Sequence, residues 1–292
     1  MIRVRITVDS ASPASAIRLV VNADDFGLSP AISRGILAAH RDGIVTSTSL
    51  LGNAVELEDA RTLLAGAPEL GVGVHLTLVG GRPVSDPATV PSLLAADGGF
   101  HARGGDLIAM WARGRVARTE VERELDAQVA RIRDAGIVVD HLDTHHHLGF
   151  LPVVGQAVEA VARRHGIAGI RSAVERPTLA WATEPRRGFE AGLLTGLAWL
   201  TRRQLGARRH GPQSWGYVES GRLDEVRILE IIGRLGPGAH ELICHPGQED
   251  AAAGETPGRY QRIGEIAALT SVKVRRALDQ RGIVRCRWGE LF

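Results

Sequence analysis

Residues 17–37 read IRLVVNADDFGLSPAISRGIL, and they decide how the chain begins to fold. The apolar run at the start of this stretch is rich in β-branched residues and predicts a buried strand that ends at Asp24 and Asp25. Ser29 before Pro30 is typical of a helix start, and apolar residues recur at helical spacing after it. The stretch therefore predicts a strand, an acidic loop and a helix.

The same change from helix to strand recurs along the chain. In four places a charged helix end is followed by a glycine suited to a left-handed cap and then by a strand start: Gly43, Gly136, Gly166 and Gly282. The hydrophobic pattern predicts strands near residues 17–23, 44–51, 71–77, 137–143, 167–171, 213–218 and 239–244. It predicts helices after residue 29 and near residues 54–66, 116–135, 152–165, 189–205, 222–235 and 270–281.

This alternation places the chain in the α/β class, because strands that alternate with helices imply parallel pairing with right-handed crossovers. Six to eight strands in 292 residues favour a distorted (β/α) TIM-like barrel over a doubly wound sheet. We expect a single domain over residues 1–292, with an N-terminal extension at 1–16. Two irregular stretches, 79–105 and 172–188, are expected to build or cover the active site.

Composition removes several classes of function. The 35 Lys and Arg are scattered among 33 Asp and Glu, which gives no reason to expect a nucleic-acid partner. Lys273 is the only lysine, which excludes a Walker-type loop and leaves little scope for a Schiff base. The two cysteines form no disulfide framework, and no apolar run has the length of a signal peptide or a membrane span. We therefore expect a soluble cytoplasmic protein without a transmembrane segment.

Carboxylates and imidazoles gather at the carboxyl ends of the predicted strands, where parallel α/β folds bind their ligands. Each such residue has an ordinary explanation by itself, as part of a turn, a helix cap or a core. Their coincidence at four strand ends favours a common site. It comprises Asp24 and Asp25, then His75, then Asp143, His145 and His147, and finally His245.

Two imidazoles and a carboxylate can hold a catalytic divalent metal while leaving positions open for water and substrate. Alternation along the strand would point His145 and His147 to one side and His146 to the other, so that only one or two of them bind a given ion. Asp25 is a candidate third ligand, and Asp24 would then accept a proton from water. Spacing alone leaves the reverse assignment of the two aspartates open.

Six segments carry a more specific signal: VNADDFGLS at 21–29, GIVTSTSL at 43–50, GVHLTL at 73–78, GRPV at 81–84, HLDTHHH at 141–147 and ELICHPG at 241–247. In this order they resemble the YdjC-like carbohydrate deacetylases. That family includes chitooligosaccharide deacetylases and proteins tied to hopanoid lipid biosynthesis. The resemblance runs from about residue 17 to the C-terminus.

The resemblance implies a distorted barrel that removes the acetyl group from an N-acetylated amino sugar, either an oligosaccharide or a lipid-linked glycoside, by attack of metal-bound water. By matching position, it implies that Asp25, His75 and His145 bind the metal, that Asp24 is the base and that His245 is the acid. It implies one divalent ion, magnesium or zinc, while nickel and cobalt also suit histidine ligands.

The resemblance also bears on substrate contacts. Arg171 matches a family arginine that a proline usually follows closely, but this chain continues with Ser172 and Ala173. The apolar stretch 189–205 predicts a buried helix, a homodimer contact or a lipid-facing groove. Aromatic rings can stack on sugars, and the candidate sugar contacts near the insertions and strand ends are Trp181, Trp215, Tyr217 and His147.

Two other functions remain open at the level of the sequence. A glycoside hydrolase would pair Asp24 with Asp25 or Asp143, but adjacent aspartates are poorly placed on opposite faces of a sugar, and the histidines stay unexplained. A catalytically silent barrel that binds sugar or metal would carry the same residues without turnover.

Overall fold

The computed structural model describes residues 16–171, 174–205, 211–248, 250 and 260–292. Within this part of the chain, eight strands form one sheet in which every pair is parallel. The strands are β1 (Ile17–Phe26), β2 (Ser47–Leu51), β3 (Gly71–Leu76), β4 (His141–Thr144), β5 (Gly169–Ile170), β6 (Gln213–Trp215), β7 (Gly238–Cys244) and β8 (Val284–Arg285).

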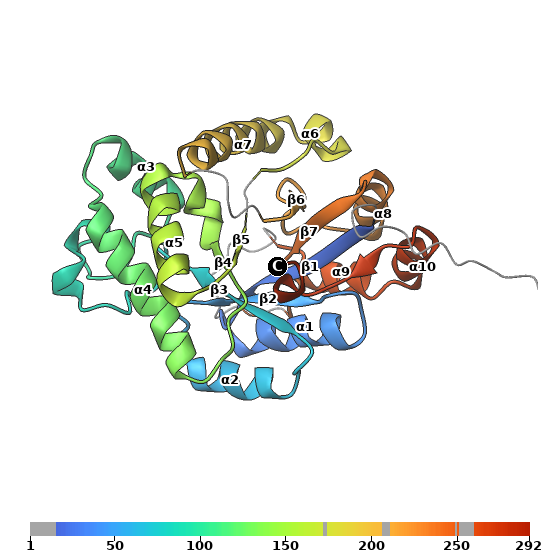
Figure 1. Cartoon of the computed structure of the whole chain (residues 1–292), viewed down its shortest axis with the longest axis horizontal. Coiled ribbons are helices and arrows are strands. Elements are labelled where there is room, and N and C mark those ends of the chain that lie inside the picture. The colour runs from blue at the N-terminus through green and yellow to red at the C-terminus, as the bar shows by residue number, and fades with distance from the viewer. Residues whose placement is uncertain (1–15, 172–173, 206–210, 249, 251–259) are drawn as a thin grey trace, which may run out of the picture.

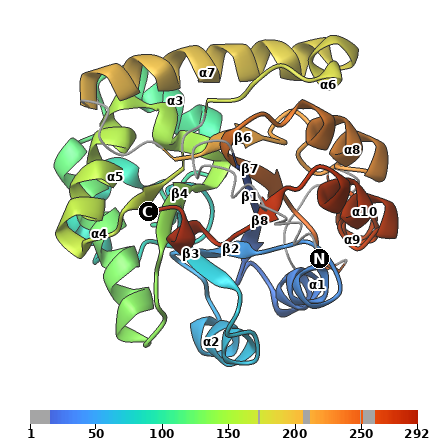
Figure 2. The ribbon, with the colours of Figure 1, turned by 45° about the vertical axis from the view of Figure 1, so that its right-hand side comes forward.

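The sheet curls into a distorted barrel. Its order is β5-β4-β3-β2-β1-β7-β6, and β8 pairs with the start of β1. A parallel bridge between Glu175, which follows β5, and Ser214 in β6 brings the two ends of this order together. Helices surround the sheet, with α6 and α7 on the opposite side from α1 and α2 (Figure 1, Figure 2). The α/β class and the distorted barrel expected from the alternation of elements are thereby confirmed.

The helices follow the strands along the chain. They are α1 (Pro30–Arg41), α2 (Leu57–Ala65), α3 (Gly104–Ala112), α4 (Arg118–Asp134), α5 (Pro152–His165), α6 (Leu179–Thr183), α7 (Pro185–Leu205), α8 (Glu225–Arg234), α9 (Arg262–Leu269) and α10 (Val272–Gln280). As the sequence predicts, the Ser29 hydroxyl caps α1 by accepting a hydrogen bond from the Ile32 amide.

Three features of the prediction were wrong. The strand expected at 137–143 spans only His141–Thr144, and the helices α3, α6 and α9 were not foreseen. The backbone is left-handed at Gly136, Gly166 and Gly282, as expected, but not at Gly43. A Cβ at Gly43 would lie 2.6 Å from the carbonyl oxygen of Leu269, so this glycine permits close packing of two backbones instead.

The two irregular stretches occupy the ends of strands. Stretch 79–105 follows β3 and contains two short 3-10 turns, Pro87–Thr89 and Pro91–Leu93. The buried carboxylate of Glu124 in α4 ties it down by accepting the amides of Val84 and Ser85. In stretch 172–188 the described part contains α6 and the start of α7. Most of the predicted N-terminal extension lies outside the described residues, and a single domain stays a prediction.

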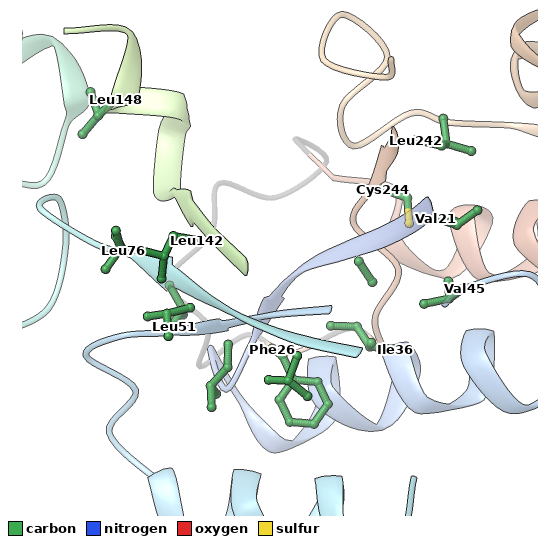
Figure 3. Close-up of a cluster of buried hydrophobic side chains, with 14 of the residues drawn as sticks. Val21, Phe26, Ile36, Val45, Leu51, Leu76, Leu142, Leu148, Leu242 and Cys244 are labelled. Carbon is green, nitrogen blue, oxygen red and sulfur yellow. The ribbon is translucent and has the colours of Figure 1, made fainter. Parts of the chain in front are cut away.

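The outer face of the sheet forms the hydrophobic core with the surrounding helices. Val21, Leu50, Val74 and Leu142 are fully buried there. Ile36 of α1 belongs to the same cluster, in which Figure 3 labels it together with Val21 and Leu142. Burial of apolar side chains is the main stabilising contribution to such a fold. Within the described residues, no helix is long and apolar enough to cross a membrane.

The inner face of the barrel is polar. The side chain of Arg171, next after β5, reaches Asp24 in β1 and Glu241 in β7 by hydrogen bonds of 2.7 and 2.8 Å. Since β5 and β1 are not neighbours in the sheet, these bonds must run across the barrel interior. Barrel interiors of this architecture are usually filled by branched apolar side chains. Here the space is used for a hydrogen-bonded network that supports the strand ends.

A pair of glycine variants tests the close packing of α1. A Cβ at Gly35 would lie 2.5 Å from the Cα of Gly247, whereas a Cβ at Gly233 in α8 meets nothing within 4 Å. We expect Gly35→Ala to lower the free energy of unfolding by about 1–3 kcal/mol despite the better helix propensity of alanine. Gly233→Ala should raise it by up to about 1 kcal/mol. Urea denaturation measures both, and equal effects would contradict the packing argument.

Candidate active site

Three side chains from different strand ends form a compact triangle. His75 Nε2 lies 3.1 Å from His145 Nδ1, and Asp25 Oδ1 lies 3.7 Å and 3.4 Å from these two nitrogens. His75 and Asp25 are buried, whereas the His145 side chain is 20% exposed and gives the triangle its contact with solvent. The residues that the sequence predicts as metal ligands are therefore brought together, and their ligating atoms face one another.

The imidazole of His75 is oriented by Asp143. Its Nδ1 lies 2.9 Å from Asp143 Oδ1 and donates to that carboxylate, while Nε2 faces the triangle. Burial disfavours a charged imidazole, but the carboxylates of Asp143 and Asp24 outweigh it and raise the pKa of His75 to about 9. A carboxylate behind a histidine in this way fixes the ring and increases its basicity toward a metal.

Asp24 is engaged by a bidentate arginine. Both terminal nitrogens of Arg171 donate to its carboxylate at 2.7 Å, and the side-chain Nδ2 of Asn22 donates to Oδ1 at 2.9 Å. Burial acts to raise the pKa of Asp24, but the charge of Arg171 more than compensates and lowers it. Asp24 is consequently ionised at neutral pH. Its Oδ2 lies 4.0 Å from His75 Nε2, at the edge of the triangle.

Asp25 differs from its neighbour in how its oxygens are used. Arg262 of α9 donates to Oδ2 at 2.7 Å, whereas the buried Oδ1 has no hydrogen-bond partner among the described residues. Burial acts to raise the pKa of Asp25, but His145 and Arg262 together hold it well below its usual range. The residue has a φ of +71°, an uncommon left-handed conformation. Its carboxylate therefore does not point to the face that the alternation of a regular strand would give it.

The expected alternation of the three consecutive histidines was wrong. The strand ends at Thr144, and His146 and His147 adopt left-handed φ values of +56° and +54° in a 3-10 turn. Period-two alternation requires an extended backbone, which this turn lacks. Of the three histidines, His145 therefore belongs to the triangle. The buried ring of His147 packs edge-on against the ring of Tyr217, with 4.9 Å between the ring centroids.

His245 follows β7 and is buried beside the site. Its ring nitrogens lie 3.3 and 3.5 Å from the Ser220 hydroxyl, and its amide donates to Glu265 at 2.6 Å. Burial lowers the pKa of His245 to about 4, although the charges of Asp25 and Asp24 act in the other direction. The ring is therefore neutral at pH 7 and able to accept a proton.

The candidate substrate contacts fare differently. Arg171 is buried, and its guanidinium binds three buried carboxylates inside the barrel. It therefore supports the site through these carboxylates. Trp215 is 2% exposed and donates its indole N–H to His240, so it has no free face for a sugar. His147 lines a small pocket. The other residues around this pocket are Glu175, Ala191, Leu194, Thr195, Ser214, Tyr217 and Ile243.

Sequence reasoning missed three residues that hold the site. Arg262 lies 237 positions from its partner Asp25, and Trp288 donates its indole N–H to Glu241 at 3.3 Å. Glu241 interrupts the otherwise apolar strand ELIC, and a charged residue in a buried strand is the one signal that could have revealed it. The arginine and the tryptophan carry no comparable local signal.

The fold and site together define a class: a distorted parallel barrel with a histidine–carboxylate centre at the carboxyl ends of its strands. The family model described as YdjC-like protein matches residues 18–280. The chain belongs to this YdjC-like family.

Named relatives agree with this assignment. A carbohydrate deacetylase from Brevibacillus brevis is 40% identical over 277 residues, which cover 94% of this chain and all of that protein. A chitooligosaccharide deacetylase from Salmonella typhimurium is 32% identical over 268 residues, which cover 90% of this chain and 95% of that protein. A solved structure of a candidate cellobiose-phosphate cleavage protein from Enterococcus faecalis superposes with a TM-score of 0.76 at 28% identity. The superposition covers 95% of this chain and 99% of that protein.

A buried acid in the pocket lined by His147 provides a test of the electrostatics of the protein interior. Burial and the nearby Glu219 raise the pKa of Glu175 from an ordinary 4.5 to about 8. The folded chain therefore binds more protons than the unfolded chain between these values, so this group makes stability fall as pH rises from about 5 to 8. Glu175→Gln should remove that fall and raise the free energy of unfolding at pH 8 by a few kcal/mol.

Urea denaturation at pH 5 and pH 8 measures this effect. Glu56→Gln, at an exposed position, is the control and should leave the pH dependence unchanged. A Glu175→Gln protein that loses stability with pH as steeply as the unchanged chain would contradict the proposed protonation.

Proposed function

We propose that this protein is a carbohydrate N-deacetylase that hydrolyses the acetamido group of an N-acetylated amino sugar. The observation that carries the proposal is the buried triangle of His75, His145 and Asp25, with one free carboxylate oxygen. The ionised Asp24 and the neutral His245 stand beside it, the first able to accept a proton from water and the second able to receive a proton and pass it on. The deacetylase names of the relatives support an N-acetylated sugar as the substrate class.

The triangle fits a divalent metal. Asp25 Oδ1 is a buried acceptor without a donor, and two imidazole nitrogens converge on it at 3.4 and 3.7 Å. Ligands bound at about 2.0–2.1 Å to one tetrahedral ion lie about 3.3 Å apart, so the observed spacing suits a shared ion. When bound, such an ion would polarise the acyl carbonyl and make a nucleophile available from water at neutral pH.

The ligand set favours one group of metals. Two imidazoles and one carboxylate suit zinc, cobalt or nickel, whereas magnesium prefers oxygen ligands and retains several waters. Among the two metals first expected, we therefore propose zinc ahead of magnesium. Asp143 and Arg262 would keep His75 and Asp25 in position before the ion binds.

Asp24 is the proposed base. Arg171 and Asn22 hold its carboxylate in a single orientation, so the proton acceptor is positioned before substrate arrives. Because the pKa of Asp24 is lowered, the residue is ionised over the whole neutral range and is ready to take a proton from the attacking water.

His245 is the proposed acid. An amide nitrogen leaves as an amine only if it is protonated, so the reaction needs a donor near the scissile bond. The neutral ring of His245 would receive the proton that Asp24 takes from the attacking water and deliver that same proton to the nitrogen. Ser220 and the backbone bond to Glu265 restrict how the ring can move.

The competing glycoside hydrolase is less well supported. Its two carboxylates must act on separate sides of a sugar, several ångströms apart. Asp24 and Asp143 instead bind the same terminal nitrogen of Arg171, and both are buried. A silent barrel that binds sugar or metal remains as the alternative outcome of the experiment below.

Compartment and assembly remain proposals. Cys244 and Cys286 are both free and buried, which is consistent with a reducing cytoplasm. Phe189 and Leu193 on α7 are 75% and 57% exposed, and a second copy of the chain could cover them in a homodimer.

An acetate-release assay tests the proposed function. Purified protein, stripped of metal and resupplied with zinc, cobalt, nickel or magnesium, is incubated with free, oligomeric and lipid-linked N-acetylglucosamine. We expect acetate from at least one substrate with zinc or cobalt and none after chelation. Sugar binding without acetate under every condition would favour the silent barrel instead.

Variants separate the proposed roles. His75→Ala and His145→Ala should lower bound metal at least about 10-fold and abolish turnover with it. His245→Ala should retain metal while kcat falls by about 10²–10⁴-fold, because only proton donation is lost. Metal content is measured by elemental analysis beside the acetate assay. Unchanged turnover in the His245→Ala protein would refute the acid role.

A further inference from the structure

The far end of the barrel is closed by the last residues of the chain. Trp288 is fully buried and begins a 3-10 turn, Trp288–Glu290, that follows β8. Its amide donates to the hydroxyl of Ser47 at the start of β2, and its ring stacks on His141 at the start of β4. Trp288 therefore occupies the mouth of the barrel opposite the strand ends that carry the candidate active site.

One chain of hydrogen bonds runs from Trp288 to the site through Glu241. The indole N–H donates to Glu241 Oε1 at 3.3 Å, and the same oxygen accepts Arg171 Nε at 2.8 Å. The terminal nitrogens of Arg171 then hold Asp24 and Asp143. Glu241 is completely buried, so a donor lost from it cannot be replaced by bulk water.

A second chain runs through the stacked ring. The planes of Trp288 and His141 differ by only 10°, with 4.8 Å between their centroids. His141 Nε2 lies 3.3 Å from the Ser49 hydroxyl, which donates to Asp143 Oδ2 at 2.9 Å. Both chains therefore meet at Asp143, which orients His75.

Glycines in the neighbouring strands leave the space that this stack needs. A Cβ at Gly73 in β3 would lie 2.3 Å from His141 Nε2. A Cβ at Gly169 in β5 would lie 2.8 Å from the Cβ of His141 and 3.1 Å from Trp288 Cε3. Both strands thus lack a side chain where the two rings lie, although glycine weakens a strand interior.

We propose that Trp288 is a positioning residue for the reaction, which it supports from the opposite mouth of the barrel. Through Glu241 it orients Arg171, and through His141 it supports Asp143, so that Asp24 and His75 keep their working geometry. The inference rests on the proposed deacetylase function for its kinetic consequence. Its structural consequence, the position of Arg171, is independent of that function.

A double-mutant cycle tests the route through Glu241. Trp288→Phe keeps a flat ring on His141 but removes the N–H, and Glu241→Gln removes the charge opposite Arg171. We expect each single variant to lower kcat about 10-fold or more, with KM within about twofold and metal content unchanged. Because both act on Arg171, the double variant should be within about twofold of Glu241→Gln. Full additivity, or unchanged kcat in Trp288→Phe, would overturn the proposal.

Two further comparisons complete the test. Val284→Thr changes an exposed residue of β8 in the same terminal segment and should leave kcat unchanged. If Trp288→Phe is too unstable to purify, Trp288→Met tests the loss of the donor, because methionine also offers no N–H or O–H to Glu241.

A crystal structure of the tryptophan variant gives a readout without activity. We expect Arg171 to turn away from Asp24 in it. An unmoved Arg171 refutes the positioning role even if the unchanged protein proves to be no deacetylase. Absence of acetate release by the unchanged protein refutes the deacetylase function alone.

Discussion

The guanidinium of Arg171 is the interaction on which the interior of this barrel depends. It binds Asp24, Asp143 and Glu241, three carboxylates that come from three different strands and are all buried. Several negative charges in a low-dielectric interior repel one another strongly, and a buried charge that loses its partner costs about 3–5 kcal/mol. Without Arg171 the strand ends would carry carboxylates that could neither ionise nor pack, and the orientation of His75 would be lost with them.

Because the barrel interior is polar, most of the burial of apolar side chains takes place on the outer face of the sheet. The outward-facing residues of β1, β2 and β3 form one hydrophobic cluster with the surrounding helices (Figure 3). In the part of the chain that the structure describes, small and polar residues predominate on the inside, and the large ring of Trp288 packs with Val20 and Cys286 to close the end of the barrel. Such a division lets the inner network be shaped by function, because the apolar layer already supplies the free energy of burial.

The sequence predicts the parts of this structure that depend on local chemistry. Apolar runs, helix caps and glycines with left-handed backbone locate most elements, and strand ends locate Asp25, His75, His145 and His245. It fails where the chain departs from a regular repeat, as in the turn that carries His146 and His147. It also fails for contacts between distant residues, because Arg262 and Trp288 reach their partners only once the barrel has closed.

The two adjacent aspartates show how the closed barrel gives identical side chains different properties. Arg171 takes both oxygens of Asp24, whereas Arg262 takes only one oxygen of Asp25. A regular strand would point the two carboxylates to opposite faces, whereas the left-handed backbone at Asp25 brings both beside His75 Nε2, at 4.0 Å for Asp24 and 3.7 Å for Asp25. A buried carboxylate oxygen that accepts no hydrogen bond is suited to a cation, whereas a carboxylate fixed by a guanidinium keeps its charge without one. This difference favours Asp25 as the ligand and Asp24 as the base, an order that spacing in the sequence could not decide.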